Sequence, residues 1–348
     1  MRKGALASPL ALASGFLTLC TLALAAMAFK KMRHHRRAAV ELGAGGAEAA
    51  DDLVGGGREA ARGGAAEPAP AAGPPPVDEA KVAAAIDKLL DVSVPIVLDQ
   101  GRLYQDSLFS CGRSHVVRFR TYGEVGEVRG LHDVLPPHDI FMQTREGKTI
   151  FDTCAVVGNS GSLLETQFGN EIDGHAAVFR FNQGITTQYE QFVGSKTTFR
   201  IYNGPEASPK EPGEIVIGTA RSGNVMRGYV ANKQQQAANA TASSFVFDPE
   251  FLCYAWRFVG NGGHKPSSGL VGIILAVKLC KTVSVYGFQS QNYFSQTSRP
   301  HYYDWERPAK GREKVHPFQR EYKLYEMLEA SGRIRRVQAP RAAGEAAR

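Results

Sequence analysis

The sequence contains, near its middle, the stretch Cys154-Ala-Val-Val-Gly-Asn-Ser-Gly-Ser-Leu-Leu164. Its apolar start, residues 154–158, is typical of a short buried strand, and we expect a helix from Leu163 after the turn. Small residues in such a turn let the backbone approach a ligand closely, and the first N–H groups of a helix attract phosphate. The pattern matches neither the dinucleotide fingerprint nor the P-loop, so by itself it indicates a turn that is more often structural than functional.

Strand and helix signals alternate on either side of this stretch. Pro317 and Gly332 are typical of the start and the stop of a helix between them. Alternation of this kind predicts an α/β fold, a Rossmann-like nucleotide-binding domain around a largely parallel sheet. The further strands are predicted at 176–181, 197–202, 214–218, 245–247 and 282–288, and the helices at 269–280 and 317–330.

The chain divides into five parts by composition. Residues 4–29 contain no charged side chain and exceed the roughly 20 residues that a membrane-spanning helix needs. We expect a transmembrane signal anchor there, although a signal peptide cut after Ala28 and an organellar transit segment are alternatives. The parts are a short cytoplasmic tail at 1–3, the anchor at 4–29, a basic and then Ala/Gly/Pro-rich disordered stem at 30–80, a globular catalytic domain at 81–338 and a tail at 339–348.

Charge and cysteine content narrow the function classes. The net charge is +7, but five positive residues lie together between Lys30 and Arg37, so nucleic-acid binding is not favoured. This cluster follows the apolar run, and the positive-inside rule would place it in the cytosol, against a lumenal domain.

Cys20 lies in the apolar run, and the other four cysteines could form two disulfides in an oxidising compartment. Zinc-site spacings and Asp-x-Asp are both missing from the sequence, so no metal site is expected.

Four groups of residues along the chain resemble the motifs of one family. The first is the opening stretch, followed by Glu171-Ile-Asp-Gly-His175, Arg180-Phe-Asn182 and Val193-Gly-Ser-Lys-Thr-Thr198. The second is Lys265-Pro-Ser-Ser-Gly-Leu270 with Leu279-Cys280 and Val283-Ser-Val-Tyr-Gly-Phe288. The third is His301-Tyr-Tyr-Asp304, and the fourth is His316 with Glu321. In this order they resemble the large, small, third and very short sialylmotifs of the eukaryotic sialyltransferases, glycosyltransferase family 29.

The resemblance implies a fold, a reaction and a set of site residues. It implies a variant of the GT-A glycosyltransferase fold and inverting transfer of sialic acid from CMP-sialic acid to a glycan hydroxyl, without a metal or other cofactor. It also implies that Cys154 and Cys280 form a disulfide. Cys111 and Cys253 are then the two remaining cysteines of the four, and we pair them on that ground alone. The residues implied to hold the CMP donor are Asn159, Ser160, Asn182, Ser267, Ser268 and Gly269.

Two histidines are the candidate catalytic residues. His316 is the implied general base, and the chemistry agrees, because the acceptor hydroxyl must lose a proton and a neutral imidazole can take it. His316 directly precedes Pro317 and the predicted helix, whose dipole disfavours imidazolium; capping of that helix is the structural alternative. His301 is implied to bind the donor phosphate as CMP leaves. Glu321 is more readily explained as a structural residue of the first helical turn.

The sequence leaves the donor sugar and the acceptor open. Gln289 stands where the family commonly has glycine, and Tyr202-Asn-Gly-Pro-Glu206 replaces a Tyr-Pro-Glu-Ser-like segment. The resemblance to this family also admits CMP-Kdo, a related keto-sugar donor, as an alternative. An inactive Golgi protein that binds glycan or nucleotide and an unrelated oxidoreductase are further alternatives. The expected partners are the CMP-sugar, a glycan acceptor and a Golgi membrane, with single-pass type II topology and a lumenal domain. Asn239 in Asn239-Ala-Thr241 is a possible glycosylation site.

Overall fold

The structure is a computed structural model that describes residues 79–109, 111, 117–204, 210–219, 221–236, 243–259, 265–288, 299–307 and 315–337. All of these belong to one compact unit, Pro75–Arg348. The predicted anchor, nearly all of the stem, the C-terminal tail, Asn239, Glu206 and Gln289 lie outside the described residues. None of the helices formed by the described residues is both long and apolar enough to cross a membrane.

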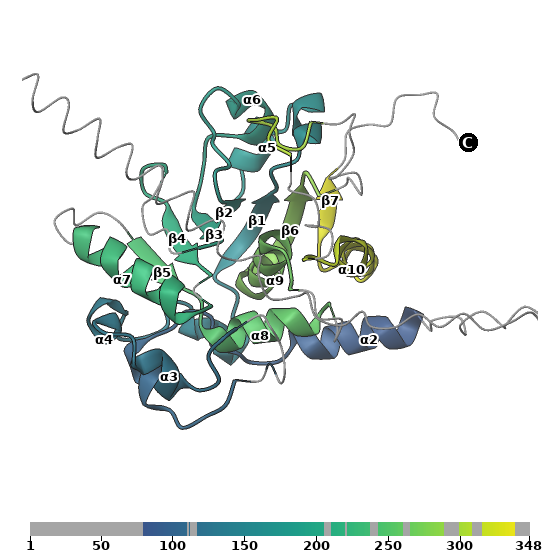
Figure 1. The fold of residues 1–348 in the computed structure, drawn as a ribbon. Helices are drawn as coiled ribbons and strands as arrows, with labels where there is room; N and C mark the ends of the chain where they lie inside the picture. The colour runs from purple at the N-terminus through teal and green to yellow at the C-terminus, as the bar shows by residue number, and fades with distance from the viewer. Residues whose placement is uncertain are drawn as a thin grey trace, which may run out of the picture. The chain divides into compact units, whose positions relative to one another are not determined.

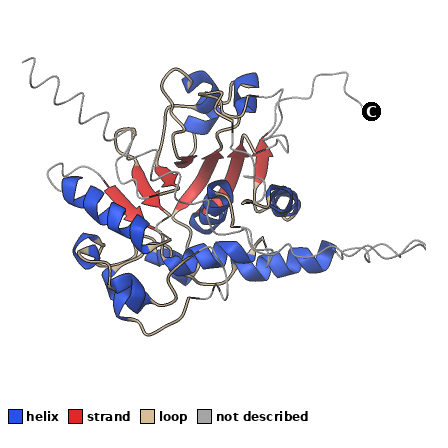
Figure 2. Cartoon of the chain, viewed as in Figure 1, coloured by secondary structure: helices blue, strands red, loops and turns tan. Residues whose placement is uncertain are grey.

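The described strands form one parallel sheet in the order β5-β4-β3-β2-β1-β6-β7 (Figures 1 and 2). Ala155 of β1 lies opposite Val178 of β2 on one side and Ser284 of β6 on the other. All five residues of β2 are buried, as expected for a parallel sheet that is covered on both faces. The strands are β1 Phe151–Val157, β2 Ala177–Phe181, β3 Phe199–Tyr202, β4 Ile215–Gly218, β5 Ser243–Val246, β6 Cys280–Tyr286 and β7 Arg335–Val337.

Helices cover both faces of the sheet. The described α-helices are α2 Glu79–Leu90, α3 Tyr122–Gly126, α4 Leu131–Val134, α5 Gly169–Asp173, α6 Glu190–Val193, α7 Gly223–Gln236, α8 Pro249–Arg257, α9 Ser268–Leu279 and α10 Phe318–Ala330. Three short 3-10 helices are η1 Gln100–Tyr104, η2 Met142–Glu146 and η3 Gly161–Glu165. Helices α5 and α6 lie on the opposite side of the sheet from α8 and α9 (Figure 1).

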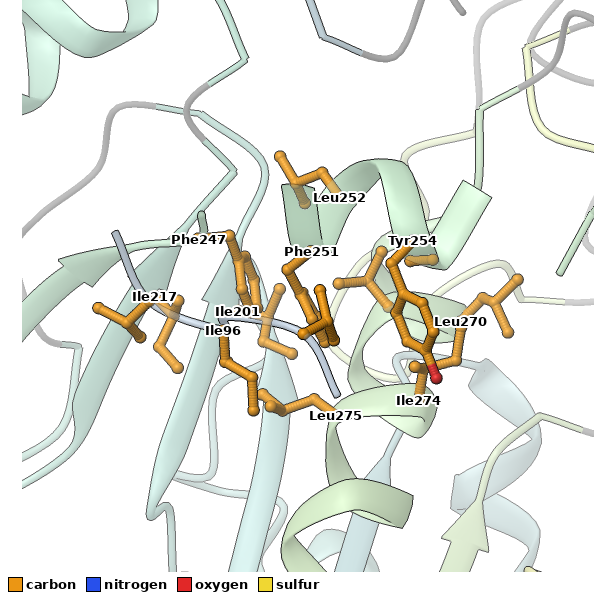
Figure 3. Packing of buried hydrophobic residues seen from close by; sticks show 14 of the residues in the cluster. Ile96, Ile201, Ile217, Phe247, Phe251, Leu252, Tyr254, Leu270, Ile274 and Leu275 are labelled. Carbon is orange, nitrogen blue, oxygen red and sulfur yellow. The ribbon is translucent and has the colours of Figure 1, made fainter. Parts of the chain in front are cut away.

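Alternate residues of β1 face two separate cores. Cys154 and Val156 belong to the larger core, whereas Ala155 and Val157 belong to the smaller one, as the two-residue period of a strand requires. The larger core lies between the sheet and helices α8 and α9, where Phe251 of α8 packs among apolar residues of α9 (Figure 3). Helix α9 is apolar almost all round, which is typical of a helix buried against a sheet.

Two disulfides are present, and they join the cysteines in the pairs expected above. Cys154 in β1 is bonded to Cys280, the first residue of β6, with a Cα–Cα distance of 6.0 Å. Cys111 is bonded to Cys253 in α8, with a Cα–Cα distance of 4.6 Å. The first bond therefore connects two strands of the sheet, and the second ties the N-terminal segment to α8.

A buried polar cluster also attaches the N-terminal segment to the start of α8. Asp248, which caps α8, is fully buried and accepts hydrogen bonds from the Tyr122 hydroxyl (2.6 Å) and from Arg102 Nε (3.2 Å). Burial raises the pKa of Asp248 to about 6, although Arg102 and Tyr122 act in the opposite direction. The cluster therefore couples the attachment of this segment to the protonation of one carboxyl group.

The α/β prediction with a largely parallel sheet is confirmed, and the predicted strands are present with shifted ends. The predicted helix from Leu163 is wrong. The chain forms only the short helix η3, because Thr166 adopts extended backbone and its N–H and hydroxyl both donate to Leu163 O (3.3 and 2.9 Å). Phosphate attraction by a long helix at this turn is therefore not available.

Candidate functional site

The connections on the two sides of β1 run in opposite directions along the sheet. From β1 the chain proceeds to β2, whereas β6 lies on the other side and continues to β7. Open parallel sheets bind ligands beside the carboxyl ends of the strands where this reversal occurs. The turn Gly158–Gly161 follows β1 there, and Gly287 and Phe288 follow β6. A Cβ atom on Gly158 would lie 2.9 Å from Gly287 O, so the two turns can approach only because that side chain is missing.

Asn159 is held at this turn by the neighbouring segments. Its Nδ2 donates to Phe181 O and to the Tyr303 hydroxyl, both at 3.2 Å, and its backbone carbonyl accepts from Tyr302 N at 2.9 Å. Its Oδ1 is buried and has no hydrogen-bond partner among the described residues. A buried acceptor without a hydrogen-bond partner costs desolvation free energy, so this oxygen is suited to accept a hydrogen bond from a ligand.

Ser160 and His301 lie side by side, joined by an isolated antiparallel bridge. The Ser160 hydroxyl accepts from Ser162 N at 3.2 Å and caps η3. The His301 ring stacks on Tyr303, with 5.2 Å between centroids, and its Nδ1 lies 2.9 Å from Asp304 Oδ1. Because a carboxylate only accepts, Nδ1 carries a proton in this contact. Asp304 and Tyr303 therefore fix the orientation of the imidazole.

Asn182 follows β2 in the left-handed backbone region, with φ of +49°, which asparagine tolerates better than most residues. Its Oδ1 accepts from Asn203 N at 2.9 Å, so the amide nitrogen is the end that it can direct to a ligand. Arg200 donates to Asn182 O (3.1 Å) and to Gly184 O (2.8 Å). Arg200 is itself fully buried and is held by both carboxylate oxygens of Glu214 at 2.9 Å.

Ser267 begins α9 and is engaged by a buried carboxylate. Its hydroxyl accepts from Leu270 N (3.1 Å) and donates to Glu321 Oε2 (2.6 Å), while its N–H donates to Glu321 Oε1 (2.7 Å). Glu321 is 1% exposed, and burial raises its pKa. A Cβ atom on Gly269 would lie 2.6 Å from the Phe288 ring, so the start of α9 packs closely on the turn after β6. Glu321 thus joins α10 to α9 in a structural role.

His316 lies directly before the N-cap of α10, Pro317. Its Nδ1 is 3.0 Å from Lys265 O. A carbonyl oxygen only accepts, so Nδ1 carries the proton, and the lone pair of the neutral ring is on Nε2. This tautomer can accept a proton at Nε2. Among the described residues, a pocket beside His316 is lined by Asn203, Thr219, Arg221, Leu252, Lys265, Pro266, Ser268, Val271 and His316.

The predicted site residues fall into two groups. Asn159, Ser160 and His301 meet at the turn after β1, whereas Ser268 and His316 line the pocket. Asn182 connects the groups through its bond to Asn203, which is also a pocket residue. Ser267 and Gly269 lie at the start of α9, next to Ser268. Within the described ranges, no cluster of three or more His, Cys, Asp or Glu side chains could hold a metal ion.

The sequence interpretation missed Thr219 and Arg221, and it included two further pocket residues, Asn203 and Lys265, only as members of longer motif stretches without a role of their own. Asn203 directly follows β3 and Thr219 directly follows β4. Polar residues at the carboxyl ends of predicted parallel strands are a signal that could have identified both. Arg221 lies two residues farther on, and only the strand order brings it to His316.

Sequence comparisons with known proteins indicate one and the same protein family. The sequence model of glycosyltransferase family 29 (sialyltransferase) matches residues 113–333. CMP-N-acetylneuraminate-beta-galactosamide-alpha-2,3-sialyltransferase 1 of Gallus gallus is 35% identical over 151 residues, which cover 39% of this chain and 43% of that protein. Sialyltransferase-like protein 5 of Oryza sativa subsp. japonica is 33% identical over 193 residues, which cover 53% and 35%. The chain thus spans less than half the length of these two relatives.

A solved structure supports the fold. The crystal structure of a mammalian sialyltransferase matches with a TM-score of 0.58 and 22% sequence identity. The match covers 76% of this chain and 96% of the other. At that identity the likeness concerns the arrangement of sheet and helices.

Proposed function

Because the chain belongs to glycosyltransferase family 29, the sialyltransferases, we propose that it transfers sialic acid from CMP-sialic acid to a hydroxyl of a glycan acceptor by an inverting displacement. The observation that carries the proposal is the tautomer of His316, whose Nδ1 bonds to Lys265 O at 3.0 Å. The acceptor hydroxyl loses a proton as it attacks the anomeric carbon, and Nε2 of His316 is the atom that takes it.

The donor is held at the turn after β1 in this proposal. The unpaired Oδ1 of Asn159 accepts a hydrogen bond from the nucleotide, and the amide of Asn182 donates one. Ser160 lies beside His301, which donates to the phosphate of the departing CMP. Because Nδ1 of His301 donates to Asp304, we assign the hydrogen bond to the phosphate to Nε2.

The start of α9 is the second part of the donor site. Ser268 and Gly269 follow Ser267 there, and Ser268 lines the pocket beside His316. Both polar groups of Ser267 bond to Glu321, so we assign Ser267 to shaping the start of α9 and Ser268 to direct contact with the donor. The N-terminal N–H groups of this helix favour a negatively charged ligand.

The wider assignment follows from family membership. We propose that the fold is a variant of the GT-A type, that no metal takes part, and that the domain is lumenal in a Golgi membrane protein anchored by residues 4–29. CMP carries one phosphate, so hydrogen bonds from histidine and from backbone N–H groups can stabilise it as it leaves. Sugar donors that release a diphosphate need a cation for this purpose. The two disulfides agree with an oxidising compartment.

The experiment is a comparison of donors. Purified full-length protein is incubated with CMP-sialic acid, CMP-Kdo or UDP-galactose in the presence of EDTA, and transfer is followed over a panel of glycan acceptors. The proposal predicts EDTA-resistant transfer from CMP-sialic acid. Transfer from CMP-Kdo alone would change the sugar and keep the enzyme class. CMP binding without transfer would indicate a binding protein, and failure to bind CMP would refute the proposal.

A further inference from the structure

The pocket beside His316 is positively charged. Its described lining residues include the cationic side chains of Arg221 and Lys265, and none of the described lining residues is acidic. The backbone N–H of Arg118 donates to Arg221 O at 2.9 Å, which brings a second arginine next to the first. A lining of this kind favours a ligand that carries negative charge.

Arg221 differs in its surroundings from Arg102 and Arg200, and it also differs from Arg180, which is buried and donates to backbone carbonyls. Arg102 pairs with Asp248 and Glu250, and Arg200 pairs with Glu211 and Glu214. Arg221 is half-buried, yet within the described part of the chain no carboxylate bonds to its guanidinium. Burial lowers the pKa of Arg221, and the charge of Arg118 lowers it further. A half-buried cation beside a like charge is costly unless a ligand brings the opposite charge.

We propose that Arg221 binds a carboxylate of the acceptor glycan, so that the acceptor is an acidic saccharide. This inference rests on the proposed function, because it places the acceptor next to His316, which takes the proton of the acceptor hydroxyl. Ser268, which we assign to the donor, lines one part of this pocket, whereas Asn159, Ser160 and His301 are not among its described lining residues, so the pocket adjoins the donor site and also reaches His316. A guanidinium matches a carboxylate with two parallel hydrogen bonds, which fixes the orientation of the sugar as well as its affinity.

The test compares acidic oligosaccharides with neutral counterparts of the same shape. The panel contains oligosaccharides that end in galacturonic, glucuronic or sialic acid, each paired with its carboxamide. Full-length wild type, Arg221→Gln and Arg221→Lys are measured for kcat/KM towards each acceptor and for KM towards the donor. Arg227→Gln is the control, because Arg227 is an exposed arginine of α7 that does not line the pocket.

At least one acid is expected to be used about 10- to 100-fold better than its carboxamide by the wild type, as for a hydrogen bond to a charged group. Arg221→Gln removes this preference, Arg221→Lys restores part of it, and Arg227→Gln retains it. Equal losses for the acid and the amide would overturn the proposal. A raised donor KM with unchanged acceptor preference would also overturn it, because the carboxylate would then belong to the donor.

Binding without donor separates this inference from the proposed function. Calorimetry with the same acids and carboxamides requires no turnover, so it gives a result even if no sugar is transferred. Tighter binding of one acid, lost in Arg221→Gln, would support the anion site. If no acid in the panel binds more tightly than its carboxamide, the inference is wrong whether or not the protein is a transferase.

Discussion

Replacement of Glu321 removes the buried group that joins α10 to the start of α9. Its carboxylate accepts hydrogen bonds from Ser267 N (2.7 Å), Ser267 Oγ (2.6 Å) and the Tyr325 hydroxyl (3.1 Å). Glu321→Ala leaves at least two of these buried donors without an acceptor, at about 1–3 kcal/mol each. We therefore expect the free energy of unfolding to fall by about 3–5 kcal/mol. Glu321→Gln keeps one acceptor oxygen, and we expect a loss of about 1–3 kcal/mol.

The assay is urea unfolding of the purified protein, followed by tryptophan fluorescence. Glu329→Gln is the matched control, since Glu329 lies on the same helix and pairs with Arg336 at a partly exposed position; its loss should stay below about 1 kcal/mol. If Glu321→Gln and Glu329→Gln had the same effect, the structural role assigned to Glu321 would be refuted. Unchanged stability together with a large fall in kcat would instead place Glu321 in catalysis.

Three further predictions concern stability. Replacing both Cys154 and Cys280 by alanine should lower the free energy of unfolding by about 3–5 kcal/mol, because their disulfide closes a separation of 126 residues. Denaturation of the wild type and of this variant, with and without reductant, measures the loss. A wild type whose stability is insensitive to reductant would contradict it. Gly272→Ala places a Cβ atom 2.5 Å from the Phe181 ring and should cost about 1–2 kcal/mol in urea unfolding, since overpacking outweighs the better helix propensity of alanine; a stabilised variant would count against this packing. Burial raises the pKa of Asp248 from 3.8 to about 6, so the contribution of its protonated form to the free energy of unfolding is full below about pH 4 and is lost as the pH rises through about 6. In urea unfolding curves recorded over this pH range, Asp248→Asn should remove the decline in stability. An unchanged pH profile would show that Asp248 is not its source.

The strands were predictable because short apolar runs bounded by turn residues fit a sheet that is buried on both faces. The helix expected from Leu163 was not formed, because the side chain of Thr166 competes for the carbonyl that a helix would use. Helix α7 carries Met226, Tyr229 and Val230 at helical spacing, but glycine and polar residues between them hide the pattern. Strand β7, with two arginines in three residues, is defined only by its pairing with β6.

The site was predictable where a motif lies within one segment. The turn from Gly158 to Gly161 and the position of His316 before a helix are both local features. The bond from His316 to Lys265 O, which decides the tautomer, joins segments that lie 51 residues apart. Arg221 follows β4, and it shares this pocket with Ser268 of α9 although the two residues lie far apart in the sequence. Contacts of this kind depend on the strand order, which composition and spacing do not specify.

The most direct test of the account is the rate of sugar transfer by His316→Ala in the presence of EDTA, measured beside the wild type with the preferred CMP-sugar. His316→Ala should bind CMP as tightly as the wild type and transfer sugar about 10²- to 10⁴-fold more slowly, which is the usual contribution of a general base. Transfer by His316→Ala within a few-fold of the wild-type rate would contradict the assignment of His316 as the base.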